Sequence, residues 1–167
     1  MILDFQIQKQ LLNEWCWAAV ASSISFKYDP NSIWQQSKLA AEILSSVCIN
    51  VDPSSAGNAP QVCHQEYKLS VVMQNYTKNS AWMVERVLTL DEVRYQINNG
   101  WPICCQIYWE SIGNAHYIVI YGYEGNTIII GDPEAGVCSA DYDDLVSGYR
   151  GGQWILSYGT QSSSLAN

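Results

Sequence analysis

The feature that most constrains the fold is a change in residue pattern at Gly100. Before it, apolar residues recur at the three- and four-residue spacing of helices. After it, short runs of β-branched and aromatic residues alternate with Gly, Asn, Asp and Pro, as in strands joined by tight turns. This division predicts an α+β fold in which a helical half packs against an antiparallel sheet.

The first predicted helix begins in an Ala-rich segment after Asn13, whose side chain we expect to be the N-cap. It ends near Asp29, because the residue before a proline disfavours helical backbone and Pro30 follows. With Asn13 as the cap, Cys16 is the third residue of the helix and lies in its first turn.

Three further helices are expected in the first half. Apolar spacing predicts one over 31–47 and a short one over 61–70. The last has clear ends, because Thr89 and Glu92 have the spacing of a capping box and Gly100 is a helix stop.

Four runs in the second half are expected to be strands. They cover 102–109, 116–125, 126–132 and 152–158. The chain is predicted to be one domain over 1–167, with a helical half at about 10–100, a β half at about 101–160 and a frayed tail at 161–167.

Composition excludes several classes of protein. Hydrophobic residues make up 48% of the chain and charged residues 14%, which is typical of a globular protein and not of a disordered one. The net charge of −8 argues against a nucleic-acid partner, which would need a basic surface. No apolar run approaches the roughly 18 residues of a membrane span.

The N-terminal segment has no basic region followed by a long apolar run, so no secretory signal is visible. Three interpretations stay open. The protein remains in the cytoplasm, is delivered by a signal-less route, or begins at a mature terminus with an added Met.

Six cysteines are present, without a CxxC pair or the Cys/His spacing of a zinc site, so neither a metal nor another cofactor is expected. Cys104 and Cys105 are adjacent in an apolar run and are predicted to be buried. Cys48 and Cys63 flank a loop-like segment and can form a disulfide in an oxidising compartment.

Cys16 is the candidate nucleophile, because a helix N-terminus and a nearby imidazolium both stabilise a thiolate. The chain has two histidines to supply that imidazolium. His64 lies in a loop-like region without an apolar frame. His116 opens a predicted strand and is the better general base, which should sit on a rigid element.

A hairpin is predicted to bring Asp132 to His116. The turn at 124–126 sets His116 opposite positions about 133–135, with Asp132 roughly one to three places away. A three-residue loop would place both side chains on one face of the sheet. Asp132 is therefore predicted to orient the imidazole of His116.

Each residue also has a purely structural interpretation. A cysteine in an Ala-rich helix is usually part of the core, a histidine at a strand start is usually structural, and Asp132 is suited to cap a turn. Four aromatic residues either line a substrate cleft or pack in the core: Trp15, Trp17, Trp109 and Tyr117.

The residues also resemble the papain-like cysteine proteases, from Gln10 to about Tyr158. The segment from Gln10 to Ala18 is similar to the nucleophile segment of that family, Q-x5-C-W-A. The later G-x-P, H-Y-x-V-I-x-G-Y and I-x-I-x-D-P motifs resemble its compact bacterial branch and lie at 100–102, 116–123 and 128–133. That branch includes effector proteases of plant pathogens and the leader-cleaving domains of bacteriocin exporters.

The resemblance implies a papain-like fold with the active site in a cleft between the two halves. It implies Cys16 as nucleophile, His116 as base, Asp132 as the third residue and the Gln10 side chain as an oxyanion donor, although Gln6 and Gln8 lie nearby. Larger family members have Cys-Gly-Ser before the nucleophile and Asn as the third residue, and this chain has neither feature.

These patterns predict a monomeric cysteine protease that acts on a protein or peptide substrate through an acyl-thioester. The same residues would serve an isopeptidase, a deamidase or a transpeptidase. Two other classes stay open: a non-catalytic binding module on this fold, and a secreted scaffold stabilised by disulfides.

Overall fold

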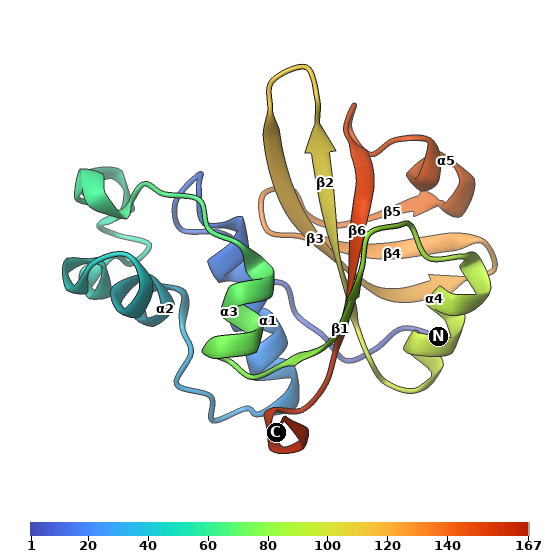
Figure 1. Cartoon of the computed structure of the whole chain (residues 1–167), viewed down its shortest axis with the longest axis horizontal. Coiled ribbons are helices and arrows are strands. Elements are labelled where there is room, and N and C mark those ends of the chain that lie inside the picture. The colour runs from blue at the N-terminus through green and yellow to red at the C-terminus, as the bar shows by residue number, and fades with distance from the viewer. Residues whose placement is uncertain (167) are drawn as a thin grey trace.

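A six-stranded antiparallel sheet forms the centre of the molecule, in the computed structural model that describes residues 1–166 (Figure 1). The strand order is β1-β6-β2-β3-β4-β5. The strands are β1 (Ser80–Val84), β2 (Ile103–Trp109), β3 (Asn114–Glu124), β4 (Thr127–Asp132), β5 (Gly136–Asp141) and β6 (Gln153–Thr160). The α+β architecture predicted from the sequence is confirmed.

Helices cover both faces of this sheet, and a core lies under each group (Figure 1). The helices are α1 (Cys16–Tyr28), α2 (Gln36–Ile43), α3 (Leu69–Asn75), α4 (Leu90–Asn98) and α5 (Tyr142–Ser147). The first three pack together on one face, where Val119 of β3 meets α1. The last two pack on the other face, around Ile118 and Ile120. No helix within residues 1–166 is long and apolar enough to cross a membrane.

Helix α1 starts later than predicted. Its first residue is Cys16, its N-cap is Trp15, and no side chain caps it, so the predicted Asn13 cap is wrong. A backbone turn precedes the helix instead, in which the Trp15 N–H donates to the Leu12 carbonyl at 3.0 Å. Every residue from Cys16 to Ser25 is buried, which is typical of a central helix.

Two predicted helices have different bounds. Helix α2 spans Gln36–Ile43 and is shorter than predicted at both ends. At its start, the Gln36 side chain is held by the backbone of the N-terminal segment. Its Oε1 accepts from the Leu11 N–H at 3.0 Å, and its Nε2 donates to the Lys9 carbonyl at 2.9 Å. The helix predicted over 61–70 is a single 3₁₀ turn at Gln61–Cys63, followed by α3.

The ends of α4 are as predicted. Thr89 and Glu92 form a reciprocal capping box, with the Glu92 N–H donating to Thr89 Oγ1 at 3.2 Å and the Thr89 N–H donating to Glu92 Oε2 at 2.7 Å. Gly100 follows the helix with φ of +84°, a conformation that favours glycine.

Strands β1 and β5 and helix α5 were not predicted, and helix α3 overlaps the helix predicted over 61–70 only at its first two residues. Strand β1 comes from the helical half of the sequence but pairs with β6, so the sheet is not confined to 101–160. Gln161 is also held, because its N–H donates to the Asn79 carbonyl at 3.0 Å. The start of the predicted frayed tail is thus fixed to the sheet, and Asn167 lies outside the described residues.

Candidate active site

Cys16 is held at the start of α1 by the tryptophans on either side of it. Trp15 Nε1 donates to the Cys63 carbonyl at 2.7 Å, and Trp17 Nε1 donates to the Gln65 carbonyl at 3.1 Å. Both indoles are fully buried, so they belong to the core and do not line a cleft. As the first helical residue, Cys16 has a backbone N–H that no preceding turn of the helix can satisfy.

His116 and Asp132 form a short hydrogen bond. The two groups are His116 Nε2 and Asp132 Oδ1, 2.7 Å apart. A carboxylate can only accept, so Nε2 carries the hydrogen and Nδ1 is left for the Cys16 side of the ring. The Asp132 side chain is fully buried, and that of His116 is 11% exposed.

A β-bulge places these two side chains on the same face of the sheet. The turn between β3 and β4 has two residues, with Glu124 opposite Thr127, and that register alone would put His116 and Asp132 on opposite faces. The register shifts between Ile120 and Gly122, so one extra residue reverses the alternation. The bulge thus has the effect that a three-residue loop would have had.

The Asp132 carboxylate accepts from several donors. Besides His116, Oδ1 accepts from the backbone N–H of Glu134 at 2.8 Å and of Ala135 at 3.2 Å. Oδ2 accepts from the Tyr149 hydroxyl at 2.7 Å. Burial alone would raise the pKa of Asp132, but the hydrogen bonds from His116 and the other donors outweigh it and lower that pKa. The carboxylate is therefore ionised at neutral pH.

The imidazole of His116 is protonated at neutral pH. Burial alone would lower its pKa, but the hydrogen bond to Asp132 and the interaction with the Cys16 sulfur raise that pKa to about 9. A cationic ring thus faces a thiol at a helix N-terminus, which is the environment that favours a thiolate.

Gln10 lines the same cleft and forms hydrogen bonds both to the residue after Asp132 and to the turn before α1. Its backbone N–H donates to the Pro133 carbonyl at 2.9 Å, next to Asp132. Its Nε2 donates to the carbonyls of Asn13 at 2.8 Å and Leu12 at 3.2 Å, in the turn before α1. Its buried Oε1 has no hydrogen-bond partner within residues 1–166.

The cleft has a volume of about 390 Å³ and opens to solvent. It is lined by Gln10, Asn13, Cys16, Glu66, Trp109, Ile112, Asn114, Ala115, His116 and Glu134. A second hollow beside it shares Glu66 and Ala115 and is also lined by Tyr117. Of the four aromatic residues considered from the sequence, Trp109 and Tyr117 therefore line hollows at this site.

The other histidine and the remaining cysteines lie outside the cleft lining. His64 Nδ1 is 3.2 Å from Glu14 Oε2, so this pair is separate from Asp132. Cys48 and Cys63 are joined by a disulfide. The backbone carbonyl of Cys63 is also the acceptor of the hydrogen bond from the Trp15 indole. Cys104 and Cys105 are fully buried, and burial raises the pKa of both thiols.

Two residues beside the site were missed in the sequence. Tyr149 contacts Asp132, and Arg150 accepts the Trp109 indole N–H through its carbonyl at 3.1 Å. Both belong to a tight turn before β6. The only sequence signal was the Gly pair at 151–152, which marks a turn without indicating what it touches.

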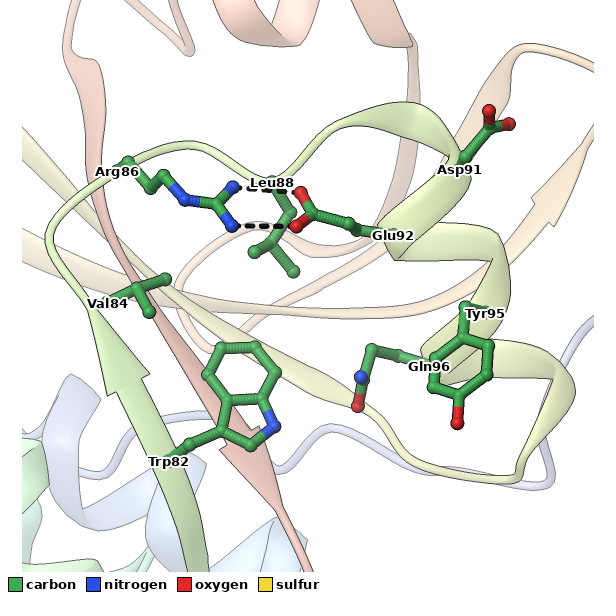
Figure 2. Close-up of a pocket in the computed structure, with 8 residues that line it drawn as sticks. All are labelled: Trp82, Val84, Arg86, Leu88, Asp91, Glu92, Tyr95 and Gln96. Atoms are coloured by element: carbon green, nitrogen blue, oxygen red, sulfur yellow. Dashed lines mark hydrogen bonds and ion pairs between the residues drawn. The ribbon is translucent and has the colours of Figure 1, made fainter.

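A larger groove lies elsewhere, between β1 and α4, with a volume of about 480 Å³ (Figure 2). An ion pair between Arg86 and Glu92 spans it, and Trp82 and Val84 of β1 face it. No residue that lines it also lines the Cys16 cleft. Within residues 1–166, no group of three His, Cys, Asp or Glu side chains is arranged to hold a metal ion.

Comparison with known proteins finds a match to a family model and similarity to solved structures. The sequence profile described as the Peptidase_C39 like family matches residues 2–160. The peptidase domain of Streptococcus ComA, a bi-functional ABC transporter involved in a quorum sensing pathway, is similar with a TM-score of 0.61 and 17% identity, over 95% of this chain and 98% of that one. A putative C39-like peptidase from Bacillus anthracis has a TM-score of 0.57 and 16% identity, over 96% and 98%. Among curated proteins, none matches significantly.

Proposed function

The chain belongs to the Peptidase_C39-like family of the papain-like cysteine proteases, and we propose that it hydrolyses peptide bonds through a thioester on Cys16. The observation that carries this proposal is the short hydrogen bond between His116 and Asp132. His116 lines the same open cleft as Cys16, which lies at a helix N-terminus. These are the nucleophile, base and orienting acid of a thiol hydrolase.

In the acylation step, the Cys16 thiolate attacks the carbonyl carbon of the scissile bond. The C–N bond then breaks, and the imidazolium of His116 donates its Nδ1 proton to the departing amine. Asp132 keeps the ring in the required orientation and stabilises its charge, without taking the proton itself. The products are an acyl-thioester on Cys16 and a neutral His116.

In the deacylation step, neutral His116 takes a proton from a water molecule that attacks the thioester carbonyl. The C–S bond breaks, the carboxylic acid leaves, and the thiolate and imidazolium are restored. Apart from the substrate and this water molecule, no group outside the chain is needed to balance either step.

The oxyanion formed in each step would lie at the start of α1. The Cys16 backbone N–H is one donor, because the first N–H groups of a helix have no partner in the helix. Gln10 Nε2 is the second: its shorter bond goes to the Asn13 carbonyl, and the longer contact to Leu12 at 3.2 Å is the one that an oxyanion would replace.

The direct test is digestion of a diverse peptide library by the wild type and by Cys16→Ala, with products identified by mass spectrometry. We expect Cys16→Ala to lose hydrolysis and keep its fold by circular dichroism, because alanine fits the buried helix start. His64→Ala is the matched control and should retain near wild-type activity. Equal loss in both variants would show that the wrong base has been assigned.

The same library separates the related thiol chemistries. An isopeptidase, a deamidase and a transpeptidase would form the same thioester from a different bond or pass it to a different acceptor. Hydrolysed α-peptide bonds support the proposal. Products found only at side-chain amides, or only in the presence of an added amine, would replace it.

A further inference from the structure

A buried tyrosine binds the oxygen of Asp132 that His116 does not use. The Tyr149 hydroxyl donates to Asp132 Oδ2 at 2.7 Å, and the side chain is 6% exposed. Because Oδ1 accepts from His116 and two backbone N–H groups, Tyr149 is the group that fixes the other end of the carboxylate. Donors on both oxygens restrict rotation of the carboxylate about its Cβ–Cγ bond.

Tyr149 is placed by a tight turn of unusual conformation. Tyr149 and Gly152 exchange backbone hydrogen bonds of 2.8 and 2.9 Å, so two residues form the turn. Their φ angles are +51° at Arg150 and +87° at Gly151, as in a type I′ turn. A non-glycine residue with positive φ is uncommon, and such conformations cluster at functional sites.

The groups around the hydroxyl keep it a hydrogen-bond donor. Burial, followed by the contacts to Cys138 and Asp132, raises the pKa of Tyr149 well above its usual range. The Cys138 sulfur lies 3.4 Å from the hydroxyl oxygen, and its S–H can donate there while the tyrosine donates to Asp132. Arg150 Nη1 is 3.6 Å from Oδ2, but its side chain is 54% exposed, so the arginine is the weaker partner.

We propose that Tyr149 is a positioning residue for catalysis: its hydroxyl aims the Asp132 carboxylate, and through it His116, at Cys16. This inference rests on the proposed peptidase function for its effect on turnover, but its effect on the His116 ring can be measured without any substrate. Tyr149 does not itself reach the cleft, whose lining does not include it.

The test uses the Tyr149→Phe variant, which removes the hydroxyl and keeps the ring that packs in the core. Tyr142→Phe is the matched control, because it also deletes one tyrosine hydrogen bond, to the Leu88 carbonyl, away from Asp132. The first readout is the pKa of His116 by NMR of ¹³C-labelled histidine. His64 is the one other histidine and serves as an internal reference.

We expect the pKa of His116 to fall in Tyr149→Phe and to stay at about 9 in Tyr142→Phe, because a misaligned carboxylate supports the imidazolium less. An unchanged value would overturn the inference. A raised value would overturn it as well, because it would mean that the hydroxyl only draws charge away from a carboxylate that is already aligned.

The second readout is turnover of a peptide from the library digest. Loss of a hydrogen bond to a charged group should lower kcat roughly tenfold with little change in KM, because the hydroxyl acts on the transition state and does not touch the substrate. A loss of thermal stability with unchanged kcat would assign Tyr149 a structural role alone. If the NMR result holds but the wild type cleaves nothing, the peptidase proposal fails and the positioning role stands.

Discussion

Substitution of Asp132 should separate the charge of the acid from its orientation of His116. In Asp132→Asn, the backbone N–H groups of Glu134 and Ala135 still need an acceptor, so the amide oxygen should occupy the Oδ1 position and continue to accept from His116. The amide nitrogen then donates to the Tyr149 oxygen, and that hydroxyl can turn toward Cys138. Geometry is kept and the negative charge is lost.

The size of the expected loss of activity in Asp132→Asn follows from the pKa of His116, which is raised from 6.5 to about 9. Without the charge of Asp132, only the interaction with Cys16 and the hydrogen bond to the amide still oppose burial, so the pKa should fall toward its ordinary value of 6.5. If it falls all the way, the protonated fraction of His116 at pH 8 drops from roughly nine-tenths to a few hundredths, so the loss can reach about thirtyfold. At about pH 5.5 both proteins would be largely protonated and the loss should be small.

The assay is kcat/KM for a cleaved peptide from pH 5 to 10. The wild type should keep its activity until the pH rises through about 9, where the imidazolium is lost. Asp132→Asn should lose activity at a lower pH, whereas Asp132→Ala should be impaired at every pH because orientation is lost too. An equal loss in Asp132→Asn at all pH values would refute the view that Asp132 acts through the charge of His116.

Two further variants test the frame around the site. In Gly152→Ala, a Cβ atom would lie 2.7 Å from Ile107 Cγ2 and Trp109 Cε2. We therefore expect the free energy of unfolding to fall by about 1–3 kcal/mol and KM to rise, because Trp109 must shift. An unchanged KM would contradict this. Replacing Cys48 and Cys63 together by serine should cost about 3 kcal/mol, because the disulfide closes a loop of about 15 residues; an unchanged Tm in the serine variant would contradict a bridge in solution.

The catalytic candidates could be predicted because each depends on local sequence. A capping box at Thr89 and Glu92 specifies its helix within three residues. The position of the turn between β3 and β4 brings the ends of the hairpin that carry His116 and Asp132 together, although the bulge is also needed to put both side chains on one face. The start of α1 could not be predicted from a side-chain cap, because it has none: the residue before it, Trp15, is buried and donates to the Cys63 carbonyl, far away in sequence.

Other features depend on contacts between distant parts of the chain. The bulge at Ile120–Gly122 has no clear sequence signal and is held by the N-terminal segment, where the Leu3 N–H donates to the Tyr121 carbonyl at 2.9 Å. Strand β1 is short and half-exposed, and its pairing with β6 is what identifies it. Tyr149 likewise reaches Asp132 through a turn whose destination the local residues do not show.

The most direct measurement is the rate of alkylation of Cys16 by iodoacetamide at pH 6, with the labelled residue identified by peptide mapping. Such mapping is needed because Cys138 is also free and half-buried. If a cationic His116 holds a thiolate at the start of α1, Cys16 should react much faster than a free thiol at that pH, and His116→Ala should remove the advantage. Reaction of Cys16 no faster than a free thiol would contradict an activated nucleophile, and with it the account of this chain as a cysteine peptidase.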